Sequence, residues 1–512
     1  MSLPDWLEPL PDAAQQRALD EWAINERGIP GIELMERAGA GLADVAGRLA
    51  PTGLLAVVCG KGNNGGDGLV CARRLRELGR EVTVLLLGAP DELQGDARTN
   101  YERLPGPLPV PFDPALLAGA AGIVDAILGT GFAGAPREPA SGAIEAINAT
   151  ADVGAPVVAC DVPSGVDAST GEVHGAAVRA VATVTFHAGK PGLWIAPGKN
   201  HAGEVTVVDI RIPPGGPADA NIGLISDRVV DGIPRRGRES TKFAAGSVLV
   251  CGGSLGLTGA PSMASEAAAR AGAGYVTACV PASLNLIFET RLLEAMTIPL
   301  PDARGSLEPS GAETVLERAA RSDALVLGPG IGREPGAFEL ARMLAQDAEL
   351  PTLIDADGLN AHAGKLGSLA DRTAATVLTP HAGELARLLE TESKEIETRR
   401  LASLLDAVTA ARAVVVLKGD DTLVASPEGR VAVSAGGSSA LATAGTGDVL
   451  SGVIGAYLAK RMDPFHAACA GVFVHSRAGR LAAEEIGPEG VIAGDVIELL
   501  PRVLAGAAPR AR

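Results

Sequence analysis

The amino-acid sequence predicts an α/β protein of two domains, each with a mostly parallel sheet covered by helices on both faces. Three observations support this prediction. The chain has 512 residues, more than one hydrophobic core usually organises. Short apolar runs alternate with helical stretches in both halves, as buried parallel strands do. A segment rich in Pro, Gly and Ala (212–223) interrupts the alternation and indicates a boundary loop.

The first half begins with helices and continues as strand–helix units. Residues 12–50 are expected to form two helices separated by Gly28-Ile29-Pro30-Gly31. From about residue 54, LLAVVCG, a glycine loop, LVCARRLRELG and EVTVLLLG predict strand, loop, helix and strand. The later runs GIVDAILG, PVVACDV and ATVTFHA predict further strands.

The same alternation restarts after the boundary segment. SVLVCGG, YVTACVP, ALVLGPG, PTLIDAD, TVLTPH and AVVVLKG are the expected strands of the second half, and MASEAAARAGAG is an expected helix. We therefore predict one domain over residues 1–220 and another over 221–512, without a detectable internal repeat.

Composition narrows the class of partner. Hydrophobic residues make up 47% of the chain and charged residues 21%, which indicates a globular protein. The net charge of −17 and the absence of basic runs disfavour nucleic acid and anionic membranes as partners. The six scattered cysteines form no Cys-x-x-Cys pair and are expected to be buried in a reducing compartment. No signal-like N-terminus or long apolar span is seen, so we expect a cytoplasmic protein that acts on small molecules, and a homo-oligomer.

A glycine-rich loop, GKGNNGGDG over Gly60–Gly68, follows the strand LLAVVCG and opens a helix. Glycine allows close approach of the backbone to a ligand, and a helix N-terminus favours an anion such as phosphate. The pattern matches neither a dinucleotide fingerprint nor a Walker loop. Taken alone, the loop is weak evidence for such a site, and a tight strand–helix turn is the alternative.

Polar residues at two other strand ends extend this site, because ligands of open parallel sheets bind at the carboxyl ends of strands. DAILGTG carries Asp125, and DVPSGVD carries Asp161 and Ser164. The oxygen atoms of Asn64, Asp125 and Ser164 suit a hard cation. Asp161 is a candidate for proton transfer, with a helix cap or Asx-turn as the alternative role.

Four ordered motifs, GKGNNGGDG, DAILGTG, DVPSGVD and FHAGKPGLWIAPG, together with the preceding GIELMERAG, resemble the NAD(P)H-hydrate epimerase family over residues 10–212. The resemblance implies a Rossmann-like three-layer domain that interconverts the R and S hydrates. It implies that Asn64, Asp125 and Ser164 hold K⁺, and that Asp161 contacts the nicotinamide hydrate, with Lys190 as its helper. The hydrate-binding residues implied are Asn63, Asn64, Gly65, Gly66, Asp67, Gly129, Thr130, Gly131, Phe132, Ala133, Gly134, Ala135 and Asp161.

In the second half, ATAGTGD places Asp448 at the start of a helix, after a glycine turn. Turn amides can stabilise a phosphoryl group while a carboxylate accepts a hydroxyl proton, which is the combination that phosphoryl transfer needs. A simple helix cap is the alternative. LKGDDT, with Lys418, suits nucleotide phosphates, and TPHAGE, DADGLN and GPGIG end three other expected strands. We favour a ligand role for His381 over a structural one.

These strings, with CGGSLGLTGAP, AARAGAGYVT and LATAGTGDVLSG, resemble the ADP-dependent NAD(P)H-hydrate dehydratase family of the ribokinase-like superfamily, over residues 227–502. The resemblance implies phosphorylation of the ring hydroxyl by ADP, elimination of phosphate, and Mg²⁺ bridging the phosphates. Asp448 is the implied base. The hydrate contacts implied are Ala260, Gly330, His381 and Asp448. The nucleotide contacts implied are Lys418, Gly419, Asp420, Asp421, Thr422 and Gly447.

One segment departs from the family pattern. A His-Lys-Gly string commonly precedes the first strand of the dehydratase, whereas this chain has Ser240-Thr241-Lys242-Phe243. Two alternatives stay open at this point. One is a vitamin-precursor or sugar kinase with a regulatory front half, and the other is a front half that has kept its fold and lost catalysis.

Overall fold

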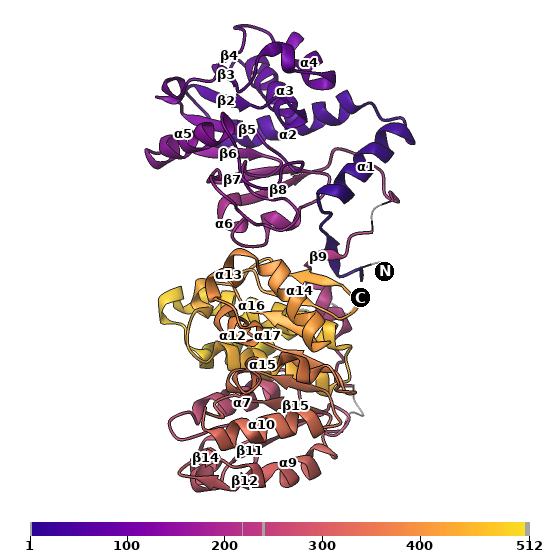
Figure 1. The fold of residues 1–512 in the computed structure, drawn as a ribbon, viewed down its shortest axis with the longest axis vertical. Helices are drawn as coiled ribbons and strands as arrows, with labels where there is room; N and C mark the ends of the chain where they lie inside the picture. The colour runs from indigo at the N-terminus through magenta and orange to yellow at the C-terminus, as the bar shows by residue number, and fades with distance from the viewer. Residues whose placement is uncertain (1–2, 218, 238–240, 507–512) are drawn as a thin grey trace. The chain divides into compact units, whose positions relative to one another are not determined.

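The computed structural model describes residues 3–217, 219–237 and 241–506. The chain divides into two compact units (Figure 1). The first is Pro9–Gly223, and the second joins Pro4–Glu8 to the chain from Leu224 onward.

The first unit is built on a seven-stranded sheet of order β4-β3-β2-β5-β6-β7-β8, in which every paired strand is parallel to its neighbour. Its strands are β2 (Leu55–Cys59), β3 (Val82–Leu86), β4 (Val110–Pro111), β5 (Gly122–Ala126), β6 (Val157–Cys160), β7 (Ala182–Phe186) and β8 (Glu204–Val208). Its α-helices are α1 (Ala13–Asn25), α2 (Gly31–Leu49), α3 (Asn63–Glu77), α4 (Gly95–Glu102), α5 (Ala140–Asp152) and α6 (Lys199–Ala202).

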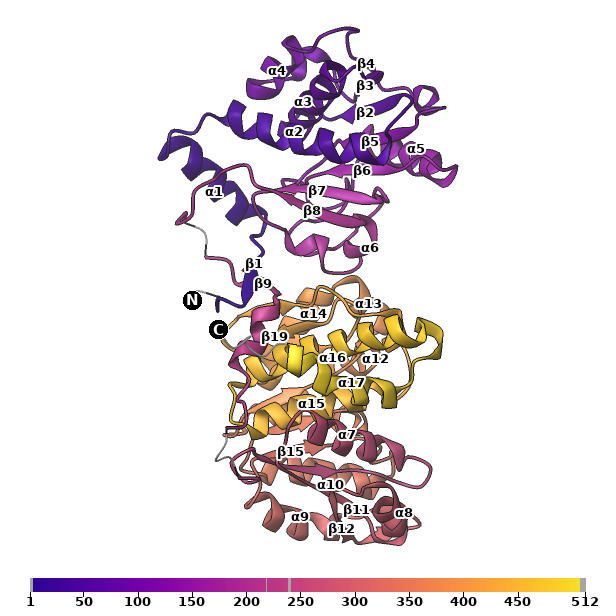
Figure 2. The same ribbon diagram turned by 180° about the vertical axis from the view of Figure 1, so that it is seen from behind.

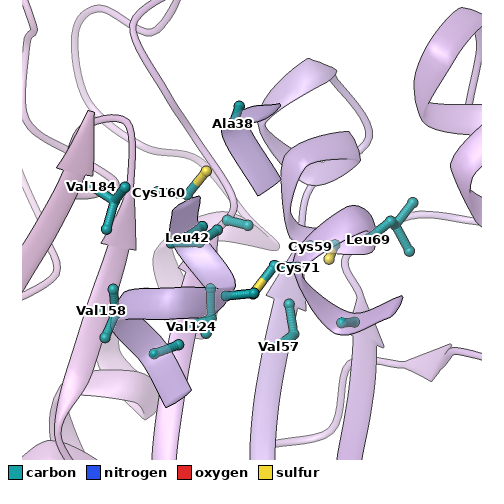
Figure 3. Close-up of a cluster of buried hydrophobic side chains, with 14 of the residues drawn as sticks. Ala38, Leu42, Val57, Cys59, Leu69, Cys71, Val124, Val158, Cys160 and Val184 are labelled. Carbon is teal, nitrogen blue, oxygen red and sulfur yellow. The ribbon is translucent and has the colours of Figure 1, made fainter. Parts of the chain in front are cut away.

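The core of this unit follows from the pleat of its strands, which turns alternate side chains to opposite faces. On β2, Val57 and Cys59 pack with α2 and α3, while Ala56 and Val58 pack with α5. Figure 3 shows the first of these clusters, where Leu42 of α2 and Cys71 of α3 lie over the sheet. Both faces are covered, which confirms the predicted three-layer α/β class for this half.

Strand order creates a crevice in the first sheet. From β2 the chain passes to β3 and β4 on one side, and then to β5 through β8 on the other. The loops that leave the carboxyl ends of β2 and β5 therefore diverge, which is where open α/β sheets bind ligands.

The second unit has an eleven-stranded sheet of order β1-β9-β20-β19-β18-β17-β16-β15-β10-β11-β12. Its strands are β1 (Leu7–Pro9), β9 (Ile222–Ile225), β10 (Ser247–Cys251), β11 (Tyr275–Pro281), β12 (Met296–Leu300), β15 (Ala324–Leu327), β16 (Thr352–Ile354), β17 (Thr376–Leu378), β18 (Val414–Leu417), β19 (Leu423–Ala425) and β20 (Val431–Val433). A separate hairpin joins β13 (Asp302–Ala303) to β14 (Ser306–Leu307). Strands β10 to β12 and β15 to β18 are parallel, and β19 and β20 are antiparallel additions.

Helices cover both faces of this sheet as well, which confirms the predicted class for the second half. α14 and α16 both contact β18 and β19, from opposite faces (Figures 1 and 2). The α-helices are α7 (Gly259–Arg270), α8 (Asn285–Arg291), α9 (Ala312–Ala319), α10 (Pro335–Asp347), α11 (Asp357–Asn360), α12 (Ala382–Leu389), α13 (Ser393–Thr398), α14 (Arg400–Ala411), α15 (Thr446–Ala459), α16 (Pro464–Ile486) and α17 (Ala493–Gly506).

The segment Pro4–Glu8 contributes to the second unit rather than to the first. β1 lies beside β9 at the edge of the large sheet, and the amide of Ser226 donates to the carbonyl of Trp6 at 3.0 Å. The Trp6 ring stacks on His466 with the ring centroids 4.8 Å apart. Burial of Trp6 stabilises this placement, which the sequence did not predict.

Two composition-based expectations can be compared with the structure. All six cysteines are buried and unpaired, as predicted. Within the described ranges, no helix has the length and apolar character needed to cross a bilayer.

Candidate active sites

The first candidate site is a cavity of about 820 Å³ at the carboxyl ends of β2, β5 and β6. The glycine loop, the chain after β5, and helices α1 and α2 form its walls. Asn63 begins α3, so free amide groups of that helix lie at the cavity. A Cβ atom at Gly65 would lie 1.9 Å from the carbonyl oxygen of Gly60, so the close approach of loop and helix requires glycine there.

Most of the hydrate-binding residues predicted from the sequence surround this cavity. Those that line it are Asn63, Asn64, Asp67, Gly129, Thr130, Gly131, Phe132 and Asp161, together with Lys190. Gly65 and Gly66 are buried within α3. Ala133, Gly134 and Ala135 are exposed and lie outside the described lining.

Asp161, directly after β6, is held by four hydrogen-bond donors. Its Oδ2 accepts from the backbone amide of Thr130 at 3.0 Å and from the Thr130 hydroxyl. Its Oδ1 accepts from the Thr185 hydroxyl at 3.1 Å and from Lys190 Nζ at 2.8 Å. Burial would raise the pKa of Asp161, but the charge of Lys190 and these donors hold it below its ordinary value. Asp161 is therefore an ionised carboxylate at neutral pH.

Lys190 is almost completely buried and lies between three acceptors. Besides Asp161, its Nζ donates to the Thr185 hydroxyl at 2.8 Å and to the carbonyl of Phe186 at 2.9 Å. An ammonium group has three protons, so each of them has an acceptor. Lys190 thus supplies a fixed positive charge beside Asp161.

Two further carboxyl groups line the same cavity. Burial, followed by the charges of Asp161 and Asp20, raises the pKa of Asp67 well above its ordinary value. Burial also raises the pKa of Asp20, which lies on α1. No part in the site was predicted for α1, although Gln16, Arg17 and Asp20 all line the cavity. The available signal was the i, i+4 spacing of two polar residues, Gln16 and Asp20, on a helix face that also carries buried residues.

Asp125, Ser164 and Asn64, the predicted cation ligands, lie next to this cavity. The Ser164 hydroxyl donates to Asp125 Oδ1 at 2.6 Å, and the Ser164 amide donates to Asp125 Oδ2 at 2.8 Å. Both polar atoms of the Asn64 amide are buried without a hydrogen-bond partner. Burial raises the pKa of Asp125 to about 6, against the hydrogen bonds from Ser164. A buried carboxylate, a hydroxyl and an unpartnered amide oxygen fit the donor set of a hard cation.

The second candidate site lies at the start of α15, in the second unit. Gly445 precedes the helix with a φ of 92°, in the left-handed region that favours glycine, and Asp448 follows in the first turn. Burial and the charges of Asp355 and Glu384 raise the pKa of Asp448 to about 7, against the attraction of Lys418. A carboxylate with this pKa can accept a proton near neutral pH.

A buried cluster of charged residues, Lys418, Asp355 and Glu384, acts on the charge of Asp448. Lys418 Nζ lies 2.8 Å from Asp355 Oδ1 and 3.6 Å from Glu384 Oε2. The Ser451 hydroxyl of α15 donates to the other Asp355 oxygen at 2.7 Å. Although burial opposes it, the attraction of Lys418 holds the pKa of Asp355 below its ordinary value. Asp355 and Glu384 lie in the sequence motifs DADGLN and TPHAGE, but no role was predicted for either residue.

His381 caps α12 and also faces this cluster. Its Nδ1 accepts from the amides of Gly383 at 3.0 Å and Glu384 at 3.3 Å, while its own amide donates to Glu384 Oε2 at 2.9 Å. Burial lowers the pKa of His381. The neutral ring therefore carries its proton on Nε2, and this half-exposed edge can donate to a ligand.

The predicted nucleotide loop after β18 is a compact turn. The Thr422 hydroxyl donates to the carbonyl of Gly419 at 2.7 Å, and the Gly437 amide donates to Asp420 at 3.3 Å. Asp421 is buried and paired with Arg400 at 2.8 Å. Asp421 thus anchors the turn, and the side chain of Lys418 lies on the side of Asp448.

The remaining predicted residues lie on neighbouring loops. A Cβ atom at Gly330 would lie 3.1 Å from that of Ala260, so these two residues adjoin after β15 and in α7. A Cβ atom at Gly447 would lie 3.6 Å from Lys418 Nζ. Lys242 Nζ lies 5.2 Å from the centroids of both the Phe243 and Tyr275 rings. Ser240 lies outside the described residues.

Two α/β units, each with buried carboxyl groups of shifted pKa at the carboxyl ends of parallel strands, define a two-site enzyme. Residues 31–192 match the family model for the N-terminus of YjeF-related proteins, and residues 248–502 match the model for NAD(P)H-hydrate dehydratase. The chain belongs to the family of bifunctional NAD(P)H-hydrate repair enzymes.

Full-length relatives show this membership. The chain is 40% identical to the bifunctional NAD(P)H-hydrate repair enzyme of Moorella thermoacetica, over 96% of each chain. It is 39% identical to that of Salinibacter ruber, over 97% of this chain and 96% of the relative. Among solved structures, the ADP/ATP-dependent NAD(P)H-hydrate dehydratase of Bacillus subtilis, co-crystallised with ATP and Mg²⁺, is 26% identical. It covers 56% of this chain and 98% of its own, with a TM-score of 0.48.

Proposed function

We propose that this chain repairs hydrated NADH and NADPH in two steps. The first unit interconverts the R and S hydrates, and the second dehydrates the S hydrate with ADP, giving NAD(P)H, AMP and phosphate. The observation that carries the proposal is that one chain matches full-length bifunctional repair enzymes and retains buried acid–base groups at both sites.

The first cavity suits a nucleotide whose nicotinamide ring reaches the buried carboxylates. The free amides at the start of α3 would bind a phosphate of the substrate, aided by the helix dipole. Asp161 remains ionised beside the ring, where it stabilises positive charge that develops when the hydroxyl leaves. It also takes a proton from the water that adds, once the Thr130 hydroxyl turns to another acceptor.

We propose K⁺ as the cation beside this cavity. Asn64, Asp125 and Ser164 would hold it, and the unpartnered Asn64 amide supports this role. When bound, K⁺ supplies positive charge that orders these oxygen atoms next to the glycine loop. The residues themselves fix the loops after β5 and β6, because Ser164 also accepts from the Leu128 amide at 2.9 Å.

In the second unit, Asp448 is the proposed base that takes the proton of the ring hydroxyl as phosphate is transferred to it. The amides after Gly445 would bind the transferred phosphoryl group, and Lys418 would balance its charge. Asp355 and Glu384 offer the carboxylate oxygens that Mg²⁺ prefers, so the donor set fits this ion. When bound, Mg²⁺ neutralises phosphate charge. Elimination of phosphate from the ring then restores the dihydropyridine.

We also propose that the chain forms a homo-oligomer and acts in the cytoplasm. Exposed leucines on the second unit, Leu255, Leu286 and Leu293, support a homo-oligomer. Light scattering after gel filtration tests the assembly, and fractionation of cells tests the proposed cytoplasmic location.

The test of function is the recovery of NADH absorbance from a mixture of R and S hydrates, with ADP, Mg²⁺ and K⁺ present. Complete recovery supports both activities. Recovery that stops at the S fraction contradicts epimerisation by the first unit. No recovery with either ADP or ATP contradicts dehydration by the second unit and favours a vitamin-precursor kinase.

A further inference from the structure

Helix α1 forms one wall of the first-unit cavity and places Gln16 and Asp20 on it. Gln16 Nε2 donates to Asp20 Oδ1 at 2.9 Å. Gln16 is 6% exposed, and its own Oε1 is buried without a hydrogen-bond partner. Unpartnered buried amide oxygens are costly in a folded protein, which indicates that this pair faces a ligand.

The charges around the cavity do not balance if all its carboxyl groups ionise. Asp20, Asp67 and Asp161 all line it, whereas Lys190 is the buried cation among the described lining residues. Lys190 is paired with Asp161, so Asp20 and Asp67 have no buried cation of their own. Desolvation without a counter-charge favours the neutral form of a carboxyl group. The site therefore combines a carboxyl group of lowered pKa, Asp161, with two of raised pKa, Asp20 and Asp67, as acid–base enzymes do.

The hydrogen bond from Gln16 decides where the proton of Asp20 lies. Burial raises the pKa of Asp20 against the hydrogen bond from Gln16, and because Oδ1 accepts from Gln16, Oδ2 is the oxygen that can carry a proton. Lys190 is a poor alternative donor, since its three protons are already bound by Asp161, Thr185 and Phe186. Asp20 and Asp161 lie on different walls of the cavity, because Asp20 belongs to α1 and Asp161 follows β6. Asp67 belongs to α3.

We propose that Asp20, oriented by Gln16, is the proton donor for the leaving hydroxyl in epimerisation. The proposal rests on the epimerase function proposed above for the first unit. Hydration of the enamine in NAD(P)H places the hydroxyl on a carbon bonded to the ring nitrogen. The C–O bond breaks, the oxygen takes the Asp20 proton and leaves as water, and the nitrogen lone pair forms a C=N bond.

Water then adds to the other face of the ring. Its oxygen forms the new C–O bond, the C=N pair returns to nitrogen, and the released proton passes to Asp161. Each cycle leaves Asp20 ionised and Asp161 protonated, and exchange with solvent resets both groups. The reverse epimerisation uses the same two groups in exchanged roles.

The test uses the full chain with Asp20→Asn, Asp20→Glu, Asp67→Asn and the control Glu26→Gln. Glu26 is an exposed carboxylate at the end of the same helix. Purified R hydrate is converted to NADH through the chain's own dehydratase, with the uncatalysed rate subtracted. Dehydration of S hydrate by each variant shows that the second unit is folded, and hydrogen exchange over β2 shows that the first unit is folded.

We expect Asp20→Asn to lower kcat for the R hydrate by about 100-fold, the usual contribution of a general acid, while KM stays close to wild type. Asp20→Glu should recover part of this loss, and Glu26→Gln should match wild type. Wild-type kcat should fall as pH rises through the pKa of Asp20, and Asp20→Asn should lack that fall. The groups that set this pKa are Gln16, Glu21, Asp67, Asp161 and Lys190.

Three results overturn the proposal: an Asp20→Asn chain with wild-type kcat and pH profile, a loss confined to KM, or the full effect in Asp67→Asn instead. Failure of the proposed function is distinguishable, because wild type would then convert S hydrate but not R hydrate.

Discussion

Replacing Lys418 with methionine tests the buried ion cluster of the second unit. The substitution keeps the length of the side chain and removes its charge, so Asp355 and Glu384 are left buried without a cation. Both carboxylates are well under one-tenth exposed, so solvent cannot replace the lysine. Breaking a buried pair in this way costs about 3–5 kcal/mol of stability. We expect a loss in this range for the second unit at neutral pH.

The loss should depend on pH with a definite sign. In wild type the pKa of Asp355 is lowered, so the stability it contributes is present above its unfolded pKa and disappears as pH falls through the folded pKa. In Lys418→Met the pKa of Asp355 is instead raised, and the penalty exists only where the carboxylate is charged. The difference between the two chains should therefore shrink as pH falls. Asp355→Asn added to Lys418→Met should restore part of the stability at neutral pH.

Native-state hydrogen exchange with mass spectrometry is the suitable assay, because the two units need not unfold together. Peptides that cover β16 and β18 report on the second unit, and peptides that cover β2 serve as an internal reference. Lys394→Met, at an exposed position of α13, is the matched control. A loss below about 1 kcal/mol, typical of a surface ion pair, would refute the reasoning. So would a difference that does not change with pH.

Three further predictions concern the two sites. Asp448→Asn should abolish dehydration but not nucleotide binding, which stopped assays and calorimetry check. The wild-type rate of dehydration should rise as pH passes about 7, where Asp448 loses its proton. A rate that does not change with pH contradicts this prediction. Asp125→Asn, or exchange of K⁺ for a bulky organic cation, should slow epimerisation and leave dehydration of the S hydrate intact; equal effects on both rates would count against the cation site. Gly65→Ala should impair R hydrate binding, because the added Cβ would lie 1.9 Å from the Gly60 carbonyl; unchanged KM would show that the loop adapts.

The alternation of apolar runs and helices was sufficient to predict the class of both units. Each run, such as LLAVVCG or AVVVLKG, contains a strand that is buried on both faces. Because both faces are buried, nearly every residue of the strand is apolar, and the run is easy to recognise in the sequence. Candidate site residues could also be predicted from the sequence. Asp161 and Lys418 directly follow such strands, and a glycine loop precedes Asp448.

Contributions from distant segments of the chain could not be predicted from the sequence. β1 joins the second sheet through β9, more than 200 residues later, and no local pattern encodes that pairing. Likewise the sequence predicted only that α1 is a helix, because Gln16 and Asp20 become part of a site only through Asp161 and Lys190, which lie on other elements.

From the sequence we could therefore predict the central strands of both sheets and the polar groups that follow them, because these properties depend on neighbouring residues. The tertiary structure alone decided how the groups are charged. Burial and the charge of Asp355 raise the pKa of Asp448 to about 7, and Lys418, which pairs with Asp355 across 63 residues, opposes that rise. Burial and opposite charge set a pKa over a few ångströms of space, so proton-transfer roles are assigned by folding rather than by motif.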